Sequence, residues 1–213
     1  MKFLLPLLFF LPFNAFAAVI LDAAHDSGDN NGATIDGVTS YSETFTAVNT
    51  LPLAYIDLLI NENSCSDGVF FKVELKPTNA GTPVSAAGAI MEANVDCVNM
   101  GTGTNWIRFT GTTTPTLTAT EIYQIVGSAT AGNPQWRMNT VGNPYASGAS
   151  YECTLGAGYG ECTTWSVWSA NLDTLFRVYV TEADPAAPPS SAQLIIFGFL
   201  LPSLFPLTRH FYV

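Results

Sequence analysis

Short runs in which apolar and polar positions alternate recur along the middle of this chain, and they constrain its fold more than any other feature. Residues 41–47, Tyr-Ser-Glu-Thr-Phe-Thr-Ala, alternate as expected of a strand with one buried face. In residues 175–180, Leu175, Arg177 and Tyr179 share one face and the intervening residues share the other. Further runs of β-forming residues are 53–60, 69–75, 89–95, 105–110, 121–127 and 135–140. The pattern predicts about nine short strands.

The spacing of these runs predicts an all-β fold. Gly, Pro, Asn and Asp separate them, which favours an antiparallel two-sheet β-sandwich of the jelly-roll type. A parallel α/β sheet would need helices between the strands, and the sequence holds no adequate helical candidate. Hydrophobic residues make up 48% of the chain, enough to fill the core of one domain, which we place at residues 18–181.

The first 17 residues have the pattern of a secretory signal peptide. Lys2 precedes an apolar run at 3–13, and Ala15-Phe16-Ala17 follows as a small-x-small cleavage site. A transmembrane helix needs about 20 apolar residues, whereas this run is shorter and contains two prolines. We therefore expect an exported protein.

The other end is organised as a linker and a hydrophobic tail. Residues 182–191 are rich in Pro, Ala and Ser, and residues 192–213 hold an apolar stretch followed by Arg209-His210. This layout looks like a bacterial C-terminal sorting tail that is cleaved and replaced by an anchor. A short uncleaved membrane anchor and a eukaryotic lipid-anchor signal are the alternatives; the absence of any Asn-x-Ser/Thr sequon favours a bacterial source. The expected location is the cell surface, the outer envelope or the extracellular space, with the membrane or a sorting machinery as the tail's partner.

The four cysteines all follow the cleavage site, where disulfides persist. Three pairings are possible, and we favour Cys153 with Cys162, which flank a Gly-rich loop, and Cys65 with Cys97. A zinc site would require closely spaced cysteine pairs or histidines, and the sequence has neither.

The charge balance excludes one class of partner. Seventeen acidic residues against seven basic ones give a net charge of −10, which repels phosphate backbones, so we expect no nucleic-acid binding.

Catalytic residues are not evident. The two histidines are His25, in an expected polar turn near the mature start, and His210 in the tail. A carboxylate pair for glycoside hydrolysis could come from Glu74, Glu92 and Glu121, but no flanking motif specifies a pair, and we expect them to face solvent. We therefore predict that the protein is not an enzyme.

Aromatic residues gather between positions 136 and 168, interleaved with glycines and polar groups. Sugar rings bind by laying C–H faces on such rings while amides and carboxylates take the hydroxyls. The candidate ligand-binding residues are Trp136, Arg137, Tyr145, Tyr151, Tyr159 and Trp165. The competing interpretation is that several of these rings belong to the core; Trp165 and Trp168, three apart, cannot both line one site on a regular strand.

An acidic, glycine-punctuated segment near the mature start is a candidate for structural calcium. The possible ligands are Asp22, Asp26, Asp29 and Asp36. Their spacing does not match the EF-hand loop, and the same residues are good turn formers. We expect no other cofactor.

The order of the aromatic and β patterns resembles a known kind of module. It comprises 43–47, 53–60, Trp106-Ile107-Arg108-Phe109, 117–123, Trp136-Arg137, Tyr145-x-x-Gly148, Trp165 and 175–179. It resembles the jelly-roll modules of exported bacterial surface proteins, which are similar to carbohydrate-binding modules and are carried on interchangeable C-terminal anchors. The resemblance spans roughly residues 36–180. The chain departs from the pattern of these modules at the insertion between Cys153 and Cys162 and in the tail.

The resemblance implies a secreted, surface-anchored, non-enzymatic β-sandwich module that is adhesive or binds a glycan or another cell-surface component. The second hypothesis is a structural envelope or matrix subunit that self-associates through strand edges or patches. A glycan-cleaving enzyme is the third.

Overall fold

The computed structural model describes residues 17–62, 65, 68–85, 88–141, 145–154, 162, 164–168 and 172–182. The expected signal peptide up to residue 16, the linker after Glu182 and the hydrophobic tail lie outside the described residues. The part from Val19 to Glu182 forms one compact unit.

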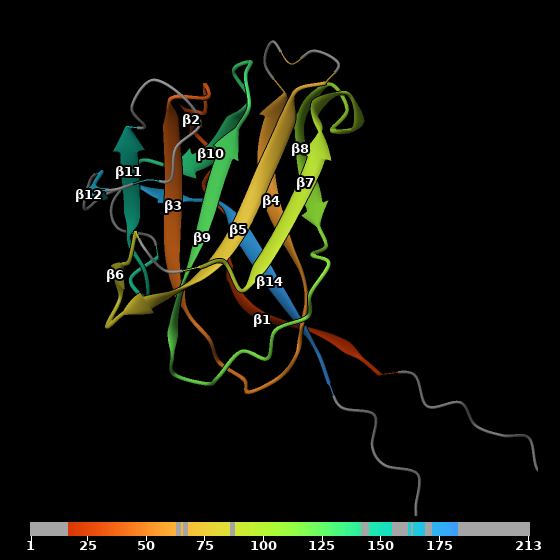
Figure 1. Cartoon of the computed structure of the whole chain (residues 1–213), viewed down its shortest axis with the longest axis vertical. Helices are drawn as coiled ribbons and strands as arrows, with labels where there is room; N and C mark the ends of the chain where they lie inside the picture. The colour runs from red at the N-terminus through yellow and green to blue at the C-terminus, as the bar shows by residue number, and fades with distance from the viewer. Residues whose placement is uncertain are drawn as a thin grey trace, which may run out of the picture. The chain divides into compact units, whose positions relative to one another are not determined.

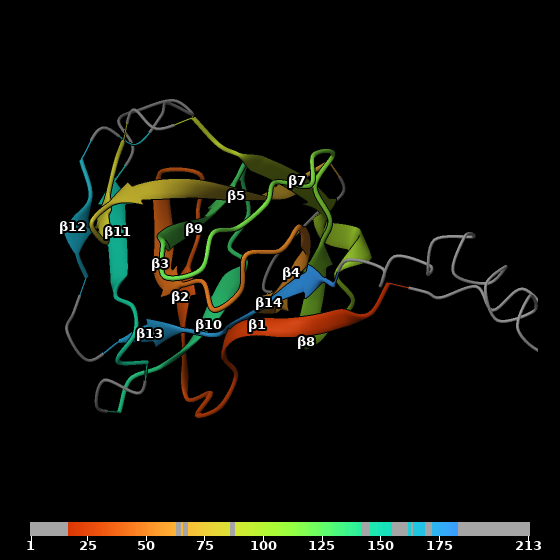
Figure 2. The ribbon, with the colours of Figure 1, turned by 90° about the horizontal axis from the view of Figure 1, so that it is seen from below.

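Two antiparallel sheets pack against each other, which confirms the expected β-sandwich (Figures 1 and 2). The first, here called the β4 sheet, contains β1 (Val19–His25), β2 (Asn31–Thr34), β4 (Leu53–Glu62), β8 (Gly103–Phe109), β10 (Gln135–Asn139), β13 (Asp173–Thr174) and β14 (Phe176–Thr181). The second, the β9 sheet, contains β3 (Thr39–Thr46), β5 (Phe70–Asn79), β6 (Thr82–Pro83), β7 (Met91–Asp96), β9 (Ile122–Ala129), β11 (Ser150–Thr154) and β12 (Ser166–Val167). A 3₁₀ turn, η1 (Cys97–Asn99), follows β7.

The chain crosses repeatedly from one sheet to the other. From β3 to β4 to β5, and again from β8 through β9 and β10 to β11, each successive strand joins the opposite layer. Figure 2 shows the layers edge-on, with β5 and β7 in one and β1, β10 and β14 in the other. Crossed connections of this kind are expected of a jelly roll.

The eight runs expected to be strands are all strands, as β3, β4, β5, β7, β8, β9, β10 and β14. Two longer strands were not expected. Residues 19–25 form β1 although Asp22 and His25 interrupt its apolar pattern, and residues 150–154 form β11. The polar turn expected around His25 is therefore wrong: the side chain ends a strand and is only 5% exposed.

Large aromatic side chains fill the space between the sheets. Phe45, Phe71, Phe109, Phe176 and Trp136 are completely buried. On β14 the alternation read from the sequence holds: Phe176, Val178 and Val180 are buried, while the residues between them face outward and are half-buried. On β14 the core therefore takes one face of the strand, and the other face lies toward the surface.

The β1 edge is interrupted where another chain could pair with it. The register with β14 shifts between Leu21 and Ala23, which makes Asp22 a bulge residue. The Asp22 carboxylate turns toward the loop after β3 and accepts from the Val48 and Asn49 amides at 3.1 and 2.8 Å. A bulge and an inward-turned charge both hinder strand addition at an edge.

Both expected disulfides are present. Cys65 is bonded to Cys97, and Cys153 to Cys162, which confirms the favoured pairing. The first bridge ties the segment between β4 and β5 to η1, and the second encloses the segment after β11. Such bridges are typical of proteins outside the reducing cytoplasm. Within the described part of the chain, no helix has the length and apolarity to cross a membrane.

Candidate binding surface

Trp136 was expected to contact a ligand, and this expectation is wrong. Its side chain is completely buried in the core, and its indole N–H donates a hydrogen bond to the Leu175 carbonyl at 2.8 Å. The ring lies so close to Gly127 that a Cβ there would come within 3.1 Å of Trp136 Cε3. On β10 the even-numbered residues face the core, so the tryptophan is structural.

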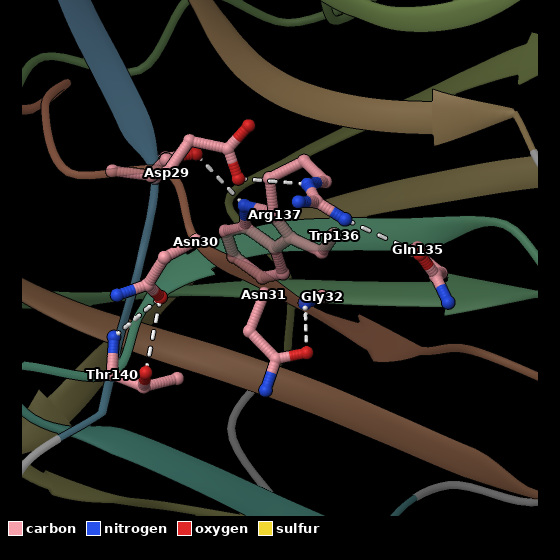
Figure 3. Close-up of polar contacts among 9 residues, drawn as sticks. Asp29, Asn30, Asn31, Gly32, Gln135, Trp136, Arg137 and Thr140 are labelled. Atoms are coloured by element: carbon pink, nitrogen blue, oxygen red, sulfur yellow. Dashed lines mark hydrogen bonds and ion pairs between the residues drawn. The ribbon is translucent and has the colours of Figure 1, made fainter.

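Arg137, the next residue, points to the outer face of the β4 sheet but is engaged by its neighbours. Its Nε lies 2.8 Å from Asp29 Oδ1, and one of its terminal nitrogens is 3.4 Å from Gln135 Oε1 (Figure 3). Nearby, the Asn30 side-chain oxygen accepts from both the amide and the hydroxyl of Thr140, each at 3.0 Å. These contacts fasten the β1–β2 loop onto β10, which accounts for Arg137 without a ligand.

The other predicted ligand residues do not form one surface with Arg137. Tyr145 is half-buried, stacks on His25 at 6.0 Å between centroids and meets Phe176 edge-on, and burial raises its pKa to about 12. Tyr151 lies on β11 in the β9 sheet, where its hydroxyl donates to the Gly81 carbonyl at 3.3 Å.

Trp165 and Tyr159 are the last two of the predicted ligand-binding residues. Trp165 is half-buried, and Tyr159 lies outside the described residues. Trp168 packs on Tyr41 at 4.5 Å between ring centroids. The aromatic-rich segment is thus divided between the two sheets and the core.

Each of the four aspartates expected to bind calcium contacts a different partner within the protein. Asp22 caps the loop after β3, and Asp36 accepts from the Val38 and Thr39 amides in a turn. Asp26 pairs with Arg177, and Asp29 with Arg137. Among the residues described, no group of three His, Cys, Asp or Glu side chains is arranged to hold a metal ion. The contacts of these four carboxylates are thus those of turn and ion-pair residues.

Two of the three glutamates considered for catalysis, Glu74 and Glu92, are brought together as cross-strand partners on β5 and β7. Glu74 lies 2.8 Å from Lys72 and 3.7 Å from Lys76 on β5, and Glu92 on β7 lies 3.7 Å from the same Lys72. Glu121 is exposed ahead of β9. Glu74 and Glu92 thus belong to a charged ladder on the outer face of the β9 sheet.

A different cluster, which the sequence interpretation missed, lies on the outer face of the β4 sheet. We call it the aromatic–arginine face; it comprises Tyr55 on β4, Trp106 and Arg108 on β8, and Arg177 and Tyr179 on β14. The strand register brings them together, because Tyr179 pairs with Tyr55 and Asp57 pairs with both Arg177 and Arg108. Residues far apart in sequence thereby form one contiguous patch across three neighbouring strands.

Stacking organises this face. The guanidinium carbon of Arg108 lies 3.6 Å from the centre of the Tyr55 ring, and that of Arg177 lies 4.0 Å from the centre of the Trp106 ring. The Tyr55 and Tyr179 rings are 4.6 Å apart between centroids. These contacts hold long side chains flat against the sheet.

Two ion pairs fix the arginines in place. Asp57, only 6% exposed, accepts from Arg108 Nε at 3.1 Å and from a terminal nitrogen at 3.3 Å. This hydrogen-bonded carboxylate raises the pKa of Arg108 above its ordinary value. Arg177 Nε lies 3.2 Å from Asp26 Oδ2. The guanidinium groups are therefore oriented by contacts within the protein itself.

A sequence signal for this face exists. Tyr55 and Asp57, Trp106 and Arg108, and Arg177 and Tyr179 are pairs two residues apart within strands, opposite in phase to the buried residues. Large aromatic residues at outward positions are unusual enough to mark a surface for attention. Only the strand order shows that the three pairs are neighbours.

Comparison with known proteins found no match to a family model, to a curated protein or to a solved structure.

Proposed function

We propose that this protein is an exported, non-enzymatic surface module that binds a glycan through the aromatic–arginine face. The observation that carries the proposal is the contiguous arrangement of Tyr55, Trp106 and Tyr179 with two stacked, ion-paired arginines on one sheet face. Aromatic rings offer apolar area to sugar C–H groups, and guanidinium and carboxylate groups offer donors and acceptors to hydroxyls.

The exposure of the polar groups supports this use. The Arg108 side chain is 56% exposed and the Asp26 side chain 44% exposed, so each can hydrogen-bond outward while it keeps its partner. Both arginines are neutralised by an aspartate, in a chain whose net charge is −10. An uncharged glycan meets no repulsion at such a face, whereas a polyanion would.

The edges of the sheets favour this proposal over self-assembly. The bulge at Asp22 interrupts β1, and β12, at the end of the β9 sheet, is only two residues long. At the opposite edge of that sheet, β7 carries the exposed Glu92. These features discourage pairing at those three edges, so a matrix subunit assembled through them is the weaker candidate.

Substituting the aromatic residues of the face should weaken binding. We expect Trp106→Ala and Tyr179→Ala each to lower the affinity for a bound oligosaccharide about tenfold or more, because each removes a stacking contact worth at least about 1.4 kcal/mol. The measurement is binding of the full secreted protein to an array of neutral and acidic oligosaccharides, followed by calorimetry on the best neutral one.

The matched control is Phe70→Ala, which removes a 42% exposed aromatic ring from β5 in the other sheet. It should leave binding unchanged. Equal binding by the wild type, Trp106→Ala and Tyr179→Ala would contradict the proposed site, and the absence of any glycan binding would contradict the proposed function.

Export and processing can be checked by mass. We expect the protein recovered from its native location to begin at Ala18 and to carry two disulfides. Intact mass spectrometry with and without reduction measures both, and it also reports whether the tail after residue 191 has been removed. A mass that retains residues 1–17 would contradict the signal-peptide prediction.

A further inference from the structure

A buried carboxyl group joins the two sheets at a point that the proposed binding function does not use. Glu43 lies on β3 in the β9 sheet and is completely buried. Its Oε2 accepts from the Ser150 hydroxyl on β11 at 2.5 Å and from the Thr174 amide and hydroxyl on β13 at 3.0 and 3.2 Å. Its Oε1 has no hydrogen-bond partner among the described residues. One carboxylate oxygen therefore holds two strands, one from each sheet.

The strand that Glu43 holds is short. β13 is two residues long and pairs with β10 only at Met138 and Asn139. Thr174 directs both its amide and its hydroxyl to Glu43, and its carbonyl accepts from His25 Nδ1 on β1 at 3.1 Å. Two titratable side chains thus bracket a single residue of β13.

The same cluster positions the neighbouring segment. Asp173, adjacent to Thr174, accepts from the Tyr145 amide at 3.0 Å. The Tyr145 ring packs on His25 and on Phe176. Movement of β13 would therefore also disturb Tyr145 and the residues beside it.

Complete burial of the Glu43 side chain favours its protonated form. Burial raises its pKa to about 8, and the nearby Asp173 adds to the rise, against hydrogen bonds from Ser150 and Thr174 that lower it. Burial also raises the pKa of Asp173. The imidazole of His25 on β1 contacts the Thr174 carbonyl, and the phenols of Tyr145 and Tyr151 also lie near Glu43.

We propose that Glu43 is a proton-dependent latch, which holds β13 between the two sheets while its carboxyl group is protonated and releases it as the proton is lost.

The direction of the pH dependence follows from where the proton binds. In the closed state Glu43 has a raised pKa, whereas in the open, hydrated state it returns toward the ordinary value of 4.5. Between these two values only the closed state holds the proton, so each unit of rising pH favours opening by up to about tenfold. The latch is tightest below about pH 5, loosens through neutral pH, and shows no further dependence above about pH 8.

Hydrogen exchange at β13 tests the latch, because the Thr174 amide donates directly to Glu43. In the full secreted protein, protection at Thr174, corrected for intrinsic exchange, should fall by up to about tenfold per pH unit from pH 5 to 8 and then level off. The Ile125 amide on β9, in the centre of the other sheet, should stay more protected at every pH. Equal protection of the two amides at every pH would overturn the proposal, because β13 would then open only by global unfolding.

Substitution adds a second test. Glu43→Gln cannot ionise and should remove the pH dependence at Thr174, whereas Glu92→Gln, which alters a 54% exposed carboxylate on β7, should keep it. Persistence of the slope in Glu43→Gln would overturn the latch. If that variant does not fold, the carboxyl carbon of Glu43 in the wild type decides by NMR: a midpoint above pH 7 supports the latch, and one near 4.5 overturns it.

Discussion

Replacing Trp136 by alanine should destabilise the sandwich by about 3 to 5 kcal/mol, the usual cost of removing a fully buried tryptophan. The side chain has no exposed surface, and its indole N–H satisfies the Leu175 carbonyl between β13 and β14. Loss of the ring leaves a cavity beside Gly127 and Phe71, and the Leu175 carbonyl loses its side-chain donor. A decrease of this size is a large fraction of the stability of an ordinary domain.

The measurement is urea unfolding of the secreted protein, followed by tryptophan fluorescence and circular dichroism. Trp106→Ala is the matched control, because that ring lies half-exposed on the aromatic–arginine face, and its removal should cost about 1 kcal/mol or less. Equal destabilisation by the two substitutions would contradict the assignment of Trp136 to the core. If Trp136→Ala loses ligand binding, the reason is therefore unfolding of the domain and not the loss of a contact between the indole and the ligand.

Removing the disulfide between Cys65 and Cys97 should cost more stability than removing the one between Cys153 and Cys162. The first closes a loop with a sequence separation of 32 and the second a loop of 9. On loop-closure entropy alone, the expected losses are about 4 and about 3 kcal/mol. Cys97 is also completely buried in the core cluster, so its replacement by alanine removes packing as well.

The comparison uses two double variants, Cys65→Ala with Cys97→Ala and Cys153→Ala with Cys162→Ala, each unfolded by heat and by urea under non-reducing conditions. The fully reduced wild-type protein should be less stable than either double variant. A larger loss for the Cys153–Cys162 pair would contradict the loop-length argument and would indicate that the segment it encloses contributes contacts of its own.

The sequence interpretation succeeded where burial repeats along a strand. β4 and β14 carry buried apolar residues at every second position, such as Ile56 and Leu58 on β4 and Phe176 and Val178 on β14, and this period is set by the geometry of a single strand. It failed at β1, because Asp22 and His25 are polar residues whose partners come from distant segments. Asp22 caps the loop after β3, and His25 donates to Thr174, so the polarity that suggested a turn reflects tertiary hydrogen bonds.

For the candidate binding site, the sequence alone predicted even less than it did for the strands. Proximity in sequence suggested that Trp136, Tyr145 and Tyr151 could share a site, but β10 and β11 belong to opposite sheets. The aromatic–arginine face instead joins β4, β8 and β14, which are separated in the chain by dozens of residues. Its members were visible as outward-facing positions, yet nothing within any one strand indicates which strand lies beside it.

Eight of the strands, the two-layer class and the preferred disulfide pairing were determined by the amino-acid sequence alone, because alternation and cysteine spacing are properties of local chain geometry. The sequence did not determine which polar residues become buried partners, as Glu43 does, or which aromatic residues meet on one surface. Those outcomes depend on strand order and register, which are set when two sheets pack over a common core and bring residues from remote strands within contact distance.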